Sequence, residues 1–104
     1  MVVEVVIENP TTEPQVLDSI DIDLTYLDGF DVRSSTPSYR GMISLEPLFN
    51  QHSFSFGTTI PASGELVVQF HGIALRSGDY GGQLEVCVNT PGNCQGYSLR
   101  TVVE

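Results

Sequence analysis

Cys87 and Cys94 are the two residues of this chain whose type and spacing could most readily support chemistry, since no other cysteine is present. Paired cysteines can bind a metal, cycle between thiol and disulfide, or form a structural bridge. A metal site needs three or four ligands, and no histidine lies near this pair in the sequence. A redox pair favours Cys-x-x-Cys at the start of a helix, a spacing absent here. A structural disulfide is therefore the favoured interpretation, with two free thiols as the alternative.

The residues between the cysteines favour the bridge, because Asn-Thr-Pro-Gly at 89–92 is a turn-forming sequence. A four-residue loop there would place Val88 opposite Asn93 and Cys87 opposite Cys94, close enough for a disulfide. Gly92 would supply the left-handed residue of the loop. Leu84 and Val86 alternate with the first cysteine, so we expect the bridge on the outer face of one hairpin. A persistent disulfide implies an oxidising compartment, which is extracellular, cell-surface or periplasmic.

Carboxylates form the second group, because Asp18, Asp21 and Asp23 lie within one short segment. Calcium binds six to eight oxygens, and clustered carboxylates at strand ends can supply several of them. Solvated carboxylates also keep a sheet from aggregating, and no EF-hand loop is present. A solvated acidic face is the favoured interpretation, and calcium binding is the alternative.

The remaining polar and aromatic side chains suggest contacts or structural roles. Tyr39 and Arg40 form an aromatic–arginine pair of the kind enriched at interfaces, which makes them the candidates for a partner contact, although an ordinary loop is the favoured interpretation. Tyr80 fits a corner tyrosine whose hydroxyl bonds to the backbone. His52 is predicted to cap one end of the core, and His71 to be a surface or partly buried residue rather than a ligand or base. No serine lies in a nucleophile elbow and no glycine-rich phosphate loop occurs, so we expect neither an enzyme nor a cofactor.

Alternating apolar residues indicate the strands that must position these groups. The clearest alternation places Ile20, Ile22, Leu24 and Tyr26 on one face. Asp28-Gly29 fits a hairpin turn or a kink between two strands, and the kink is preferred. Residues 33–41 fit a loop. About seven short strands separated by turns predict an antiparallel β-sandwich, with further strands expected at residues 2–8, 43–45, 52–60, 66–75, 80–88 and 97–103.

Composition limits the partners. The chain has 104 residues, enough for one domain over residues 1–104, and a formal charge of −9. That charge disfavours nucleic acids and anionic membranes. No apolar run is long enough to span a membrane, so no direct insertion is expected. The chain begins and ends on strand-like sequence without a signal peptide, which suggests a domain excised from a longer polypeptide. We expect a monomer that contacts a protein partner or neighbouring domains of the same chain.

Three segments resemble a known family type. VVIENPTTEP, TTIPASGELVVQF and SGDYGGQLEV are similar to the opening, middle and closing strands of bacterial and archaeal immunoglobulin-like adhesion and accessory modules. The hairpin cysteines and the long segment at 33–47 depart from the usual pattern. The opening also looks like the desiccation-related domains of late-embryogenesis proteins, which the cysteine hairpin does not fit.

The resemblance implies an immunoglobulin-like β-sandwich without catalytic activity. Such a module would act outside the cytoplasm as a spacer, adhesion or protein-assembly unit of a surface or secreted protein. The alternative function is a carbohydrate- or calcium-binding accessory module of a secreted enzyme. A fold-level resemblance does not by itself identify a ligand.

Overall fold

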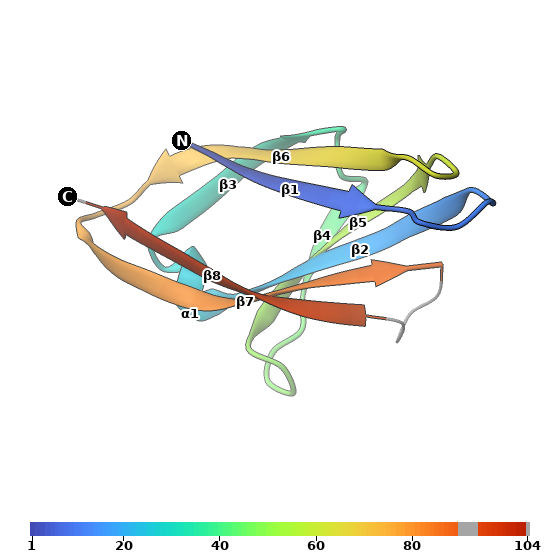
Figure 1. Cartoon of the computed structure of the whole chain (residues 1–104). Coiled ribbons are helices and arrows are strands. Elements are labelled where there is room, and N and C mark those ends of the chain that lie inside the picture. The colour runs from blue at the N-terminus through green and yellow to red at the C-terminus, as the bar shows by residue number, and fades with distance from the viewer. Residues whose placement is uncertain (90–93, 104) are drawn as a thin grey trace.

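Two antiparallel β-sheets pack face to face in a computed structural model that describes residues 1–89 and 94–103. The two layers are seen in Figure 1, with both termini at the same end of the molecule. The sandwich measures 43 × 28 × 22 Å. The predicted antiparallel β-sandwich is therefore confirmed.

The described residues form a three-stranded sheet, a five-stranded sheet and one short helix. The smaller sheet has the order β1-β6-β3, with β1 (Val2–Glu8), β6 (Glu65–Ala74) and β3 (Phe30–Thr36). The larger sheet has the order β4-β5-β2-β7-β8, with β4 (Gly41–Ser44), β5 (Gln51–Ile60), β2 (Gln15–Asp23), β7 (Gly78–Val88) and β8 (Cys94–Val103). The helix is α1 (Leu24–Leu27).

The strand predictions hold for β1, β2, β5, β6, β7 and β8, with small changes at their ends. The loop predicted over 33–41 was wrong at its beginning, because β3 continues to Thr36 and pairs with Gln69 of β6. The strand expected at 43–45 is present as β4, which begins two residues earlier and pairs with β5, although every residue of β4 is exposed. Eight strands are consequently present among the described residues, one more than the approximate count expected from the sequence.

The strand predicted through Tyr26 ends earlier, at Asp23, and the chain then forms α1. Tyr26 is still buried, because the helical turn directs its ring into the core and its hydroxyl lies 2.7 Å from Thr101 Oγ1. β2 and β3 belong to different sheets, so the chain crosses between layers at Asp28-Gly29. This excludes a hairpin between these strands and agrees with the preferred kink.

The core lies between the sheets and consists of side chains that alternate along the strands and face inward. A row of aromatic rings crosses it, with Phe70 at 5.3 Å from Phe54 and 6.1 Å from Phe56 in edge-to-face contacts. Aliphatic side chains fill the space around these rings. The fully buried aliphatic members are Leu17, Ile20, Ile22, Ile60, Val68 and Leu84.

Candidate functional site

The two cysteines form the predicted disulfide. Cys87 and Cys94 are opposed in the β7–β8 register, their Cα atoms are 4.1 Å apart, and their sulfur atoms are bonded at 2.01 Å. The predicted pairing of Leu84 with Tyr97 is also present. The loop predicted at 89–92, including Gly92, lies largely outside the described residues.

The three aspartates predicted as calcium candidates lie along β2. Asp23 is engaged by neutral groups, because its carboxylate accepts hydrogen bonds from the Gln83 backbone N–H at 2.7 Å and from Gln51 Nε2 at 3.0 Å. The same Gln51 nitrogen lies 3.3 Å from Glu85 Oε1. An amide therefore bridges these two carboxylates on the outer face of the large sheet. Asp18 is half-buried beside the bulge between Leu17 and Ser19.

Asp21 is the most buried of the three, with only 9% of its surface exposed. Its Oδ1 has no hydrogen-bond partner among the residues that the structure describes, and its Oδ2 lies 4.0 Å from Cys87 Sγ. This sulfur belongs to a disulfide and has no proton to donate. Within residues 1–89 and 94–103, no three His, Cys, Asp or Glu side chains are grouped so that they could hold a metal ion. Calcium binding at these aspartates therefore stays an untested alternative to the solvated acidic face.

Tyr39 and Arg40 have different environments. The Tyr39 ring is half-buried and packs edge-to-face on Phe54, with ring centroids 5.1 Å apart. Its backbone N–H donates to Ser35 Oγ. Arg40 is exposed, and its guanidinium lies over Gly57. The structure therefore places the tyrosine at the core rather than in an exposed aromatic–arginine pair, and a partner contact at Arg40 stays a prediction.

Tyr80 has the structural role expected of a corner tyrosine. Its hydroxyl donates to the carbonyl oxygens of Arg76 and Ser77 at 3.2 and 3.3 Å. His71 is half-buried and its Nε2 lies 3.0 Å from Thr36 Oγ1. His52 is also half-buried, and it borders a small cavity beside Phe54 at one edge of the core.

One ion pair perturbs titration at the surface. Arg100 binds Asp79 through two contacts, Nε to Oδ1 at 3.0 Å and Nη2 to Oδ2 at 2.7 Å. These hydrogen bonds lower the pKa of Asp79 and raise the pKa of Arg100, because each charged form stabilises the other. Both groups are fully solvated, so the pair is a surface feature.

A groove that sequence reasoning missed runs between β1 of the small sheet and β7–β8 of the large sheet. We call it the β1–β8 groove. Its volume is about 740 Å³, within the range of ligand-binding clefts. Its apolar lining includes Val5, Ile7, Leu84, Val86, Tyr97 and Leu99. Alternation predicted that most of these side chains face inward, but which strands lie at the sheet edges depends on the pairing order.

No helix in the described part of the chain has both the length and the apolar character needed to cross a membrane. No protein-family model matches the chain, and neither a curated protein nor a solved structure shows significant similarity to it.

Proposed function

We propose that this chain is a non-catalytic, extracytoplasmic β-sandwich module that serves as a spacer, adhesion or assembly unit of a surface or secreted protein. The observation that carries the proposal is the Cys87–Cys94 disulfide within an all-β scaffold. Disulfides persist in oxidising compartments and are rare in reducing ones. The bridge closes a short hairpin, which supports a structural role.

The pairing of the central strands supports an immunoglobulin-like arrangement. In such sandwiches the second strand pairs with the fifth and the fifth with the fourth, while the third and sixth pair in the other sheet. β2, β5 and β4 pair in that way, and so do β3 and β6. The outer strands differ, because β1 lies beside β6 and β7–β8 lie beside β2.

The free edges of the sandwich support a role in protein assembly. Among the described strands, β1 and β8 each pair with only one other, and they lie on the same side of the molecule in different layers (Figure 1). Unpaired strand edges can accept a strand from another chain. A spacer that joins neighbouring domains can use the same edges.

Alkylation of the protein in its native cells tests the compartment. Cells are lysed in denaturant, and free thiols are labelled with a maleimide either directly or after reduction. The mass of the chain is then measured in both samples. We expect no added mass before reduction and two maleimides after it, because the chain has two cysteines and both are in the bridge. Two maleimides on the unreduced chain would overturn the proposed compartment.

Protease treatment of intact cells tests the location directly. A surface module should be cleaved or released while a cytoplasmic marker stays intact. Full protection of the module in intact cells, with cleavage only after lysis of every membrane, would contradict an extracytoplasmic location.

A further inference from the structure

One edge of β1 is hydrogen-bonded to β6, and the other edge has no described strand beside it. On one side β1 pairs with β6 over its whole length without a bulge, from Val2 opposite His71 to Glu8 opposite Glu65. On the other side no described strand pairs with it. An open edge exposes a row of backbone donors and acceptors, and such a row can pair with another chain.

The hydrogen bonds at both ends of this ladder fix which residues face the open edge. Met1 and Gly72 exchange two backbone bonds at one end, and the Asn9 N–H donates to Gly64 O at the other. Hydrogen-bonded and non-bonded pairs alternate along an antiparallel ladder. The odd-numbered residues of β1 therefore bond to β6, and the N–H and C=O groups of Val2, Glu4, Val6 and Glu8 point to the open edge.

The β1–β8 groove begins at this open edge. Val5 and Ile7 of β1 face into it, opposite Leu84 and Val86 of β7. Tyr97 of β8 lines the other wall and keeps 53% of its surface exposed. A strand added to β1 would direct alternate side chains between these walls, because neighbouring strands share one pleat.

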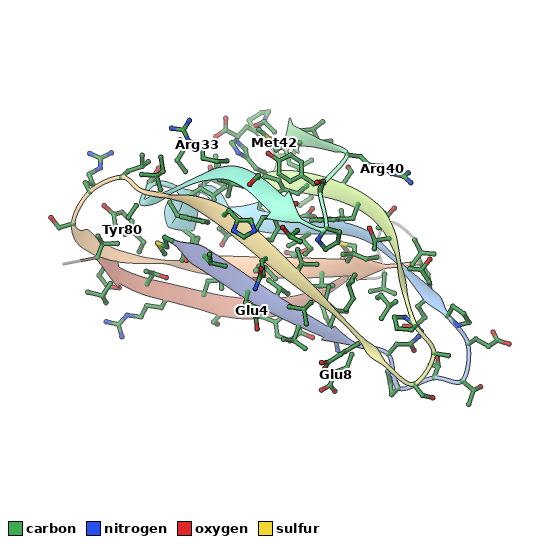
Figure 2. All side chains as sticks on the ribbon, turned by 90° about the horizontal axis from the view of Figure 1, so that it is seen from above. Glu4, Glu8, Arg33, Arg40, Met42 and Tyr80 are labelled. Atoms are coloured by element: carbon green, nitrogen blue, oxygen red, sulfur yellow. A yellow bond between two sulfur atoms is a disulfide. The ribbon has the colours of Figure 1, made fainter. Side chains whose placement is uncertain are left out.

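The charges along the groove are all negative. Glu4 and Glu8 line it, and no lysine or arginine does. Both glutamates lie along β1 on the side that faces solvent (Figure 2). On an added strand, the side chains nearest to Glu4 and Glu8 would be those of the residues directly across from them. A positive charge at those positions stabilises pairing, and a negative charge opposes it.

We propose that the β1–β8 groove binds an extended basic strand of a protein partner, which pairs with the open edge of β1. This inference rests on the proposed assembly function. The strand has apolar side chains opposite Val5 and Ile7, which enter the groove, and Lys or Arg opposite Glu4 and Glu8. The added strand runs antiparallel to β1, which places its central N–H against Val6. Its five-residue pattern is basic–apolar–any–apolar–basic.

A second copy of this chain fits the edge poorly. β1 contains two glutamates and no cation, so pairing β1 with β1 brings four carboxylates to one interface. A basic partner instead neutralises them, in keeping with the formal charge of −9 on the whole chain. Electrostatic attraction of this kind raises association rates and weakens with salt.

Titration calorimetry with a synthetic peptide centred on Lys-Val-Thr-Val-Lys tests the proposal. We expect saturable binding with a dissociation constant on the order of 0.1 mM, which weakens as salt rises. Glu-Val-Thr-Val-Glu keeps the apolar residues and reverses the charge. Lys-Val-Pro-Val-Lys keeps the charge and removes a central N–H needed for pairing. Neither control peptide should bind measurably.

Two protein variants locate the site. Val6→Pro removes an N–H that faces the open edge and leaves the β1–β6 bonds in place, so the fold should persist while peptide binding is lost. Glu4→Lys with Glu8→Lys should weaken binding at least about fivefold, since two attractive pairs become repulsive. Glu46→Lys changes charge in the β4–β5 loop, away from the groove, and should retain most of the binding. Circular dichroism checks the fold of each variant.

Each outcome decides the proposal. Absence of binding to the Lys-Val-Thr-Val-Lys peptide at about 1 mM would overturn it, as would equal binding of the proline peptide or of the Val6→Pro protein. Concentration-dependent dimerisation through β1 would show that a second copy is the occupant and would also overturn it. The thiol and protease tests in native cells are independent, so a failed peptide titration beside oxidised cysteines leaves the extracytoplasmic module intact.

Discussion

Asn9 organises the connection between β1 and β2 through four hydrogen bonds. It is fully buried, and its Nδ2 donates to the carbonyl oxygens of Glu13 and Ile60. Its Oδ1 accepts from the N–H and the hydroxyl of Thr11. The side chain thus replaces backbone partners in a segment that two prolines, Pro10 and Pro14, keep out of the sheets.

Replacement of this amide should destabilise the whole sandwich. We expect Asn9→Ala to lower the free energy of unfolding by about 2–3 kcal/mol, because the buried carbonyl of Ile60 and the partly buried contact to Glu13 O lose their donor. Urea denaturation measures the change. Thr12→Ala in the same connection is the control, since Thr12 is exposed, and it should shift stability by less than about 0.5 kcal/mol. An equal effect of both variants would contradict this role.

The Asp79–Arg100 pair makes a pH-dependent contribution to stability. Its hydrogen bonds hold the pKa of Asp79 below the unfolded-state value. The contribution is therefore present above the unfolded pKa and is lost as pH falls through the lower folded pKa. We expect Arg100→Gln to raise the Asp79 pKa in a carboxyl NMR titration. Arg76→Gln is the control, because this arginine is not bonded to Asp79. An equal rise of the Asp79 pKa in the Arg76→Gln variant would show that Arg100 is not the cause of the lowered pKa.

At the scale of elements, the crossing from β2 to β3 depends on a close approach at Gly29. A Cβ atom at this position would overlap the Tyr80 ring. The Tyr80 hydroxyl is held by two backbone carbonyls, so the ring cannot easily move away. The contact between Tyr80 and Gly29 therefore fixes the position of the β2–β3 connection relative to the start of β7.

We expect Gly29→Ala to cost about 1–3 kcal/mol of stability, as overpacked sites do. Gly41→Ala is the matched control, because a Cβ atom at Gly41 meets nothing within 4 Å. That control should be neutral or slightly stabilising. Thermal unfolding of the two variants gives the comparison, and similar melting temperatures would show that the approach is not tight.

The β7–β8 hairpin gains stability from its disulfide. A closed loop of this size contributes roughly 2.5 kcal/mol in the chain-entropy description. Cys87→Ala with Cys94→Ala should lose about that amount in guanidinium denaturation. Reduction should destabilise the natural chain to a similar extent and leave the alanine variant unchanged. If reduction had no effect on the natural chain, the bridge would not stabilise the fold.

For the whole molecule, local patterns predicted the strands and left the assembly open. The alternation of Ile20 and Ile22 shows that β2 is half-buried, and the spacing of Cys87 and Cys94 indicates a hairpin. The continued alternation at Leu24 and Tyr26 concealed α1, because a helical turn can bury the same residues. The pairing order depends on long-range contacts, so the open edge of β1 was not accessible from the sequence.

The open edge of β1 is the central structural claim, and amide hydrogen exchange of the free protein tests it most directly. We expect slow exchange at Val3, Val5 and Ile7, whose N–H groups bond to β6, and fast exchange at Val2, Glu4, Val6 and Glu8. This two-residue alternation would confirm that β1 is paired on one side only. Equal protection of all these amides in the monomeric protein would contradict it, since the outer edge would then already be covered.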